Sequence, residues 1–198
     1  WRFEQRAAGK TTINAKPGKF WDPSDWDMIH YMRDSVMAHD VAPILLQGKV
    51  EQSLFWIDKK RGFHQGTGKL CKGRIDAYNE DHNLICDLKS AADASYAGFQ
   101  KAVINYHYDI QDAFYYDGWA AAHGTPAQAF VFIVVEKLPP WGVGCYSLER
   151  NWQEEGRKVY QHLLTRFKDC MEQNIWPCYP TEVRSLIMPA YAKIHKMS

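Results

Sequence analysis

The spacing of apolar residues along the chain changes in the course of the sequence, and each change marks a new kind of element. After Pro23, apolar side chains such as Met28, Met32 and Val36 recur every three or four residues, which predicts a helix. From Lys49 onward the spacing falls to two, the period of a strand. The same criteria, with turn residues as boundaries, predict helices at about 24–39, 41–46, 96–105, 108–122 and 151–173, and strands at about 49–57, 69–78, 84–88, 128–136 and 143–147.

Short polar turns join the first three predicted strands. The turns at 59–62 and 79–83 are tight enough for antiparallel hairpins. The run Ala-Phe-Val-Phe-Ile-Val-Val is apolar without alternation, which is typical of a central strand that is covered on both faces. We therefore predict one α/β domain over 1–198, with a central mixed sheet, an antiparallel meander and flanking helices. Residues 1–22 are expected to be an irregular lead-in that follows a segment upstream of Trp1.

Composition narrows the class of protein without identifying its function. The chain has 24 Lys and Arg against 23 Asp and Glu, which excludes a polybasic arm or an acidic tail but not a local basic groove. Its five Cys contain no Cys-x-x-Cys pair, so we expect reduced, packed thiols in a cytoplasmic protein and no iron–sulfur cluster. No apolar run approaches the roughly 18 residues that a membrane span needs, and no membrane association is expected.

Two carboxylates and a lysine flank the predicted turn at 79–83. Asp76 lies before that turn and Asp87 after it, so a hairpin brings them to one end of the sheet, and Lys89 shares a strand face with Asp87. Two carboxylates suit a hard cation such as Mg²⁺, with Mn²⁺ as a substitute, which polarises a phosphodiester and lowers the pKa of a bound water. Lys89 would orient that water or stabilise negative charge. For a bare Asp-x-Lys, a solvated strand edge with a surface ion pair is the commoner interpretation, and the placement of a second acid across the turn shifts the balance toward a site.

Several sequence motifs, in order, resemble the PD-(D/E)XK nuclease core of the RecB-like branch, and especially the RecE-type (exonuclease VIII) recombination exonucleases. The likeness extends over nearly the whole chain. The motifs that carry it are Gly-Arg-Ile-Asp at 73–76, Asp-Leu-Lys at 87–89, Tyr-x-x-Gln-x-x-x-Tyr at 108–115, and the longer strings at 51–56, 106–118 and 176–193.

The resemblance assigns roles to individual residues. It implies that Lys89 is the catalytic lysine, and that Gln111 and Tyr115, which share a helical face, complete the site. A helix that merely packs on the sheet would explain the same pair. The metal ligands that the resemblance implies are Asp76, Asp87 and the Leu88 carbonyl.

A further ligand of the family, a His on an upstream helix, would lie before Trp1. His39 does not match that motif position, and a packed or capping role is expected for it. Glu51 is the backup acidic ligand, although an outward-facing strand Glu is equally consistent with its position.

The resemblance also implies an activity and partners. It points to a 5′-to-3′ exonuclease on double-stranded DNA ends, which hands a 3′ single strand to a single-strand annealing protein in phage or prophage recombination, and to a homo-oligomeric ring around DNA. The alternatives are a RecB-like endonuclease or single-strand nuclease, and a catalytically inactive DNA-binding or assembly module. The DNA-binding candidates near the motifs are Arg74, Lys72, Ser90 and Lys101.

Overall fold

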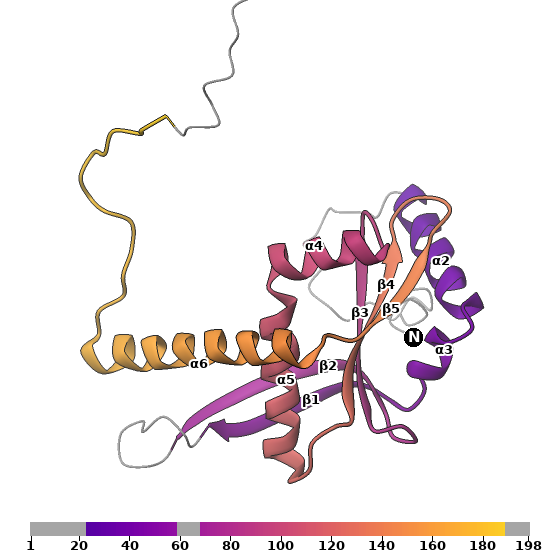
Figure 1. The fold of residues 1–198 in the computed structure, drawn as a ribbon, viewed down its shortest axis with the longest axis horizontal. Helices are drawn as coiled ribbons and strands as arrows, with labels where there is room; N and C mark the ends of the chain where they lie inside the picture. The colour runs from indigo at the N-terminus through magenta and orange to yellow at the C-terminus, as the bar shows by residue number, and fades with distance from the viewer. Residues whose placement is uncertain (1–22, 59–67, 189–198) are drawn as a thin grey trace, which may run out of the picture.

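A computed structural model describes residues 23–58 and 68–188. These residues form one five-stranded sheet with helices packed against it (Figure 1). The strand order is β1-β2-β3-β4-β5. β3 and β4 are parallel, and the other neighbours are antiparallel. The predicted fold class, a mixed α/β sheet with an antiparallel meander, is confirmed. The strands are β1 (Lys49–Asp58), β2 (Lys69–Asn79), β3 (Leu84–Ala91), β4 (Ala129–Glu136) and β5 (Val143–Tyr146).

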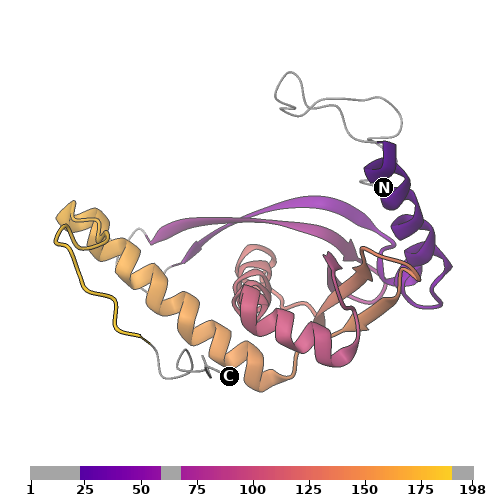
Figure 2. The same ribbon diagram turned by 90° about the horizontal axis from the view of Figure 1, so that it is seen from above.

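Helices cover both faces of the sheet. α2 and α3 pack on one face and α4, α5 and α6 on the other, while β1 and β2 arch over α5 (Figure 2). All five predicted helices are present, and the described part of the tail, 174–188, contains neither helix nor strand. The predicted lead-in at 1–22, the turn at 59–62 and the end of the tail lie outside the described residues. The helices are α2 (Pro23–Ala38), α3 (Ala42–Leu45), α4 (Tyr96–Tyr106), α5 (Tyr108–His123) and α6 (Arg150–Gln173).

The apolar run of β4 serves two cores at once. Phe132 and Val134 pack in the core beneath α4 and α5, whereas Ile133 and Val135 pack in the core beneath α2 and α3. All four side chains are buried. Because successive strand residues point to opposite faces, a strand covered on both sides must be apolar throughout. The predicted central strand is therefore confirmed.

The side-chain alternation of β2 reverses at Asp76. Ile75 packs in the core on the α5 side and Ala77 in the core on the α2 side, although residues two apart share a face in a regular strand. The register of β1 with β2 pairs Val50 with Ala77 and Gln52 with Ile75, and Glu51, which lies between these pairs, has a left-handed φ of 54°. Such a conformation costs a non-glycine residue on the order of 1–3 kcal/mol and is concentrated at functional sites. The reversal thus singles out the stretch of sheet around Asp76.

His39 has a structural role at the start of α3. Its Nδ1 atom accepts hydrogen bonds from the backbone amides of Val41 and Ala42, each at 3.1 Å. These amides precede or begin a helix and lack intrahelical partners. The capping role expected for His39 is confirmed. Among residues 23–58 and 68–188, no helix is both long and apolar enough to cross a membrane.

A polar seam joins α5 to α6. Arg157 donates two hydrogen bonds to the Asp117 carboxylate, at 2.7 and 2.8 Å, and the Tyr160 hydroxyl donates a third at 2.6 Å. Asp112, which is buried, accepts a hydrogen bond from Gln153 Nε2 at 2.9 Å. Burial is the main cause that raises the pKa of Asp112 to about 7, with the charge of Asp117 adding to it. Between about pH 4 and pH 7, the folded chain therefore keeps a proton on the Asp112 carboxyl group that the unfolded chain releases.

We expect Asp112→Asn to stabilise the fold above neutral pH. The raised pKa of Asp112 contributes stability at acid pH that is lost as the pH rises from about 4 to about 7. Asn stays neutral and keeps an acceptor for Gln153, so the variant should unfold several degrees above the wild type near pH 8, at roughly 2–4 °C per kcal/mol. The two proteins should unfold together near pH 4. Asp81→Asn, in an exposed turn, is the control, and equal melting temperatures at alkaline pH would refute the burial argument.

Candidate active site

The candidate site lies where β2 and β3 separate. Their pairing is confined to Ala77–Asn79 opposite Leu84–Cys86; beyond it, β2 continues along β1 and β3 along β4. Asp76 and Asp87 are the first residues past the paired stretch, so both carboxylates stand at the fork. The Leu88 amide donates a hydrogen bond to Asp76 Oδ2 at 2.9 Å, which links the two strands there. The hairpin thus brings the predicted acids together.

Gln111 connects Asp87 to Lys89 from above the sheet. Its Nε2 atom donates a hydrogen bond to Asp87 Oδ1 at 2.6 Å, and its Oε1 atom accepts one from Lys89 Nζ at 2.9 Å. Lys89 Nζ also lies 2.5 Å from Asp87 Oδ2. Because α5 carries Gln111, packing of that helix on the sheet fixes the carboxylate and the ammonium relative to each other.

Two opposing effects act on the pKa of the Asp87 carboxyl group. Asp87 is 4% exposed, and this burial is the largest cause raising its pKa, to which the nearby Asp76 charge adds. The Lys89 charge and the hydrogen bond from Gln111 lower that pKa in turn. Asp87 Oδ2 is buried, and its partner is the Lys89 ammonium. A buried carboxylate beside a second carboxylate is costly, and a cation shared by Asp76 and Asp87 would relieve that cost.

Lys89 is held on a third side by an aromatic ring. Its ammonium lies 4.7 Å from the centroid of the Tyr108 ring, within the range of a cation–π interaction. The Lys89 side chain is 18% exposed, so it remains accessible from solvent while it contacts Asp87, Gln111 and Tyr108. An accessible ammonium in a fixed position is suited to a phosphate group.

Tyr115 lies one turn along α5 from Gln111 and plays a different part. Its ring rests on Gly73 of β2, where an added Cβ would lie 2.9 Å from Tyr115 Cε1. Gly73 therefore permits the close approach of helix and strand, and Tyr115 packs with the core on that face. Of the two helix residues in the motif, Gln111 contacts the acid and the lysine, while Tyr115 sets the distance of α5 from the sheet.

The donors at the fork fit a hard divalent cation. The Asp76 and Asp87 carboxylates are oxygen ligands of the kind that Mg²⁺ prefers, and the carbonyl of Leu88, whose amide contacts Asp76, is the third predicted donor. Within the described ranges, no group of three or more His, Cys, Asp or Glu side chains gathers in a metal-binding arrangement. Glu51 instead forms an ion pair with Arg74, at 2.6 Å between Oε2 and Nε. Mg²⁺ commonly completes its shell with water and substrate phosphate.

The four predicted DNA-binding residues lie in three different places. Ser90 and Lys101 line a cavity of about 520 Å³ that opens beside Lys89. Arg74 stays near the fork through its ion pair with Glu51. Lys72 is exposed on β2, whose neighbouring position Gly73 faces α5, so Lys72 points away from the cavity.

The sequence did not indicate one further basic residue of this cavity. Lys137 lines it together with Lys89 and Lys101. Lys137 follows the last paired residue of β4, Glu136, which lies opposite Ala91 at the end of β3. Lys137 is there because β3 and β4 pair in parallel and end together. The lengths of these two strands in the sequence could have indicated this position.

Comparisons with known proteins place this geometry in a wider context. A family model described as a PDDEXK-like domain of unknown function (DUF3799) matches residues 5–187. A crystal structure named "Putative exonuclease", from Eubacterium rectale, aligns with a TM-score of 0.60 at 15% identity, over 91% of this chain and 73% of that chain, which shows a likeness of fold. The structure of SSO0001 aligns with a TM-score of 0.40 at 14% identity, over 80% of this chain and 64% of that chain. No curated protein matches the chain.

Proposed function

Because the chain belongs to the family of PDDEXK-like domains (DUF3799), we propose that it is a Mg²⁺-dependent deoxyribonuclease that hydrolyses phosphodiester bonds at the β2–β3 fork. One observation carries the proposal. Asp76 and Asp87 stand together where the strands part, and Gln111 holds the Lys89 ammonium against the second carboxylate. A surface ion pair would need neither the burial of Asp87 nor the bridging amide.

The residues at the fork would divide the work of hydrolysis. Asp76, Asp87 and the Leu88 carbonyl would hold Mg²⁺, which, when bound, supplies a Lewis acid and lowers the pKa of a coordinated water. Lys89 donates hydrogen bonds to the scissile phosphate and stabilises the negative charge that develops on it. Gln111 keeps the Lys89 ammonium in place while substrate binds. Water is the nucleophile, so no covalent enzyme intermediate forms.

The finer activity that we propose is a 5′-to-3′ exonuclease on double-stranded DNA ends. It is supported by the ordered motifs that resemble those of RecE-type exonucleases, and this resemblance also suggests a single-strand annealing protein as partner in phage or prophage recombination. It is further supported by the cavity beside Lys89, since an exonuclease must receive a strand end.

Three DNA substrates test this activity: an end-labelled linear duplex, a closed circular duplex and a single strand. In Mg²⁺, we expect nucleotides to be released from a linear duplex labelled at its ends, while a closed circle stays intact. Cutting of the circle would support a RecB-like endonuclease instead, and degradation of single strands alone a single-strand nuclease. Binding without any cutting would support a DNA-binding or assembly module.

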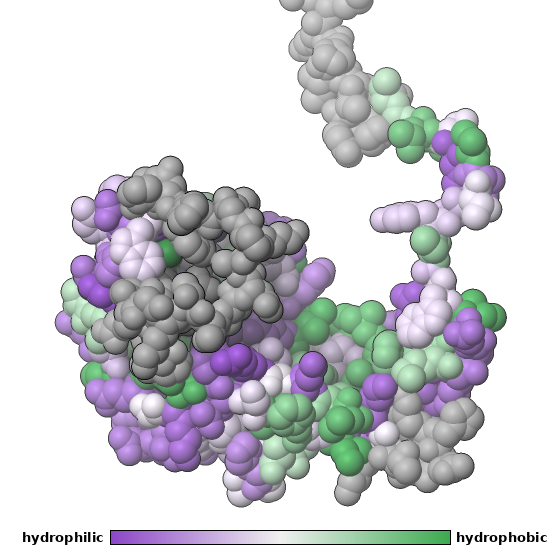
Figure 3. All heavy atoms as spheres, turned by 180° about the vertical axis from the view of Figure 1, so that it is seen from behind, coloured by the Kyte–Doolittle hydropathy of each residue, from purple (hydrophilic) through white to green (hydrophobic). Residues whose placement is uncertain are grey.

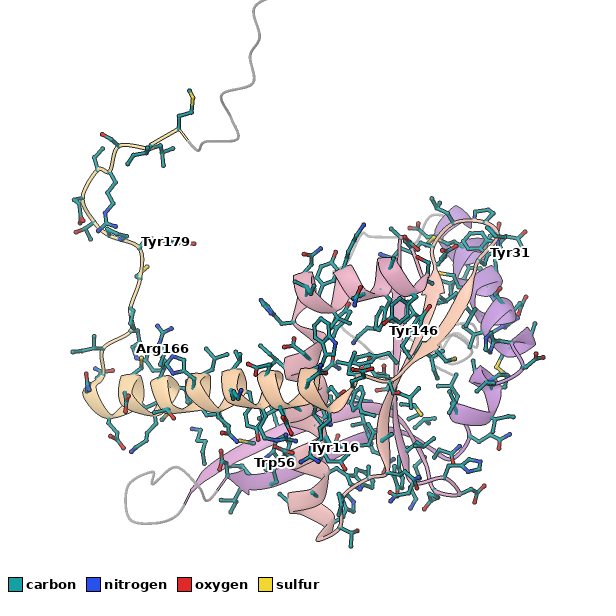
Figure 4. All side chains as sticks on the ribbon, in the orientation of Figure 1. Tyr31, Trp56, Tyr116, Tyr146, Arg166 and Tyr179 are labelled. Atoms are coloured by element: carbon teal, nitrogen blue, oxygen red, sulfur yellow. The ribbon has the colours of Figure 1, made fainter. Side chains whose placement is uncertain are left out.

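We also propose a homo-oligomer, and a ring around DNA is the form that the resemblance suggests. Support comes from exposed apolar side chains on α6 and in the tail; Figure 3 shows apolar residues in the tail among polar ones. Leu163 on α6 is 47% exposed, and Val183 and Leu186 in the tail are almost wholly exposed, as is Tyr179, which stands clear of the body in Figure 4. A second copy of the chain would cover these exposed apolar side chains.

We expect the triple substitution Val183→Ser, Leu186→Ser and Ile187→Ser to reduce the assembly to monomers, because it removes three of these apolar contacts. Light scattering coupled to size-exclusion chromatography measures the mass directly. Thr181→Ala, in the same tail, is the control and should leave the mass unchanged. A wild-type protein that is monomeric throughout would contradict the oligomer.

A further inference from the structure

The cavity beside Lys89 has the size and position of a ligand site. It lies between the end of β3 and the exposed side of α4, and its volume of about 520 Å³ falls within the range of small-molecule sites. Lys89, Ser90 and Tyr108 form the wall nearest the fork, so a molecule in the cavity would lie next to the proposed scissile phosphate.

The charge of the cavity favours a phosphate. Lys89, Lys101 and Lys137 line it against a single acid, Asp93. The Asp93 carboxylate is engaged by the turn before α4, where Oδ1 accepts a hydrogen bond from the Ser95 amide at 2.9 Å, and hydrogen bonds from Ser95 lower its pKa. Neither Lys101 nor Lys137 forms an ion pair with any residue in 23–58 or 68–188. The Lys101 charge also lowers the pKa of Asp93, but without an ion pair both ammonium groups can still bind an anion.

The far wall of the cavity presents an aromatic face. Tyr106 is 69% exposed at the end of α4, and its ring centroid lies 5.7 Å from that of Tyr108, with an interplanar angle of 31°. His107, with a φ of 56°, makes the sharp turn from α4 to α5 that sets the two tyrosines side by side. An exposed ring beside ammonium groups is a platform on which a nucleobase stacks.

We propose that this cavity binds one nucleotide of the substrate strand, the one next to the scissile phosphate. Lys101 and Lys137 hold its phosphate, and Tyr106 stacks on its base. The proposal rests on the proposed nuclease function, since that function places a DNA strand at Lys89. It adds a substrate subsite built from α4 and the end of β4, with positioning residues outside the fork.

Binding of deoxyadenosine 5′-monophosphate tests the subsite without any cleavage. We expect titration calorimetry to show binding to the wild type, and the double variant Lys101→Gln, Lys137→Gln to bind at least about tenfold more weakly, since charge-assisted hydrogen bonds are lost. For a single-stranded oligonucleotide, the slope of log K against log[salt] should become shallower by about 0.7, the contribution of the one phosphate that the two lysines hold. Lys158→Gln and Arg166→Gln, exposed basic residues of α6, form the control.

Tyr106→Ser provides an independent variant on an exposed side chain, and we expect it to weaken nucleotide binding without changing the salt dependence. Equal nucleotide binding by the wild type and the double lysine variant, or no binding by the wild type, would overturn the subsite. Nucleotide binding that depends on Lys101 and Lys137 in a protein that never cuts DNA would uphold the subsite and refute the nuclease. If the protein is a nuclease and the cavity is its subsite, the double variant Lys101→Gln, Lys137→Gln should raise KM for DNA and leave kcat nearly unchanged.

Discussion

Replacing Lys89 by Ala should abolish DNA cleavage while DNA binding is largely preserved. The substitution removes the only ammonium that the described residues place against the Asp87 carboxylate, and with it the stabilisation of charge that develops on the phosphate. Loss of a single positioned donor of this kind costs about 100-fold to 1,000-fold in rate. Single-turnover cleavage of an end-labelled duplex measures the rate, and fluorescence anisotropy with the same duplex measures binding.

Two further variants separate chemistry from folding. Lys89→Ala leaves the buried Asp87 without its cationic partner, so a stability loss accompanies it. Lys89→Gln keeps a donor for Gln111 and Asp87 but lacks the charge, and it should be equally inactive with a smaller change in melting temperature. Lys158→Ala, on the exposed face of α6, should behave as the wild type. Full activity of Lys89→Ala would remove the lysine from the mechanism.

Replacing Asp87 by Asn should eliminate activity and yet raise stability in the absence of metal. Burial raises the pKa of Asp87, so its ionised form destabilises the fold progressively as the pH rises above the ordinary aspartate range. A neutral amide escapes that cost but binds a hard cation poorly. A substitution that stabilises the fold and removes function is the signature of a residue kept for its chemistry.

Thermal unfolding with and without Mg²⁺ measures both effects. In EDTA, Asp87→Asn should melt above the wild type near neutral pH. Addition of Mg²⁺ should raise the melting temperature of the wild type, because a ligand that binds only the folded state stabilises it, and should leave the variant unchanged. Asp81→Asn, in the exposed turn between β2 and β3, is the matched control. An equal Mg²⁺-induced rise in the Asp87→Asn variant would exclude this carboxylate as a ligand.

The features that could be predicted from the sequence are those set by residues close together in the chain. The helices and strands follow from the spacing of apolar residues and from their turns. Asp76 and Asp87 converge because a single short turn separates their strands, and Asp87 and Lys89 share a face because they are two residues apart. These local relations suffice to place the acids and the lysine at one end of the meander.

Features that depend on contacts between distant segments could not be predicted in the same way. The reversal of β2 at Asp76 accompanies the left-handed φ of Glu51 on another strand, which no period-two pattern reveals. Lys137 reaches the cavity only through the parallel pairing of β3 with β4. Tyr115 matches a motif and yet packs on Gly73, because the close approach of α5 to β2 decides which helix residue contacts the acid.

The most direct test of the fork as a metal-dependent catalytic site is cleavage of labelled duplex DNA under three conditions. The wild type is incubated with Mg²⁺ and with EDTA, and Asp76→Asn is incubated with Mg²⁺, with binding measured in each case. We predict cleavage by the wild type in Mg²⁺ alone, with DNA bound by both proteins. Cleavage at equal rates in all three, or intact DNA bound by the wild type in Mg²⁺, would contradict the proposed site.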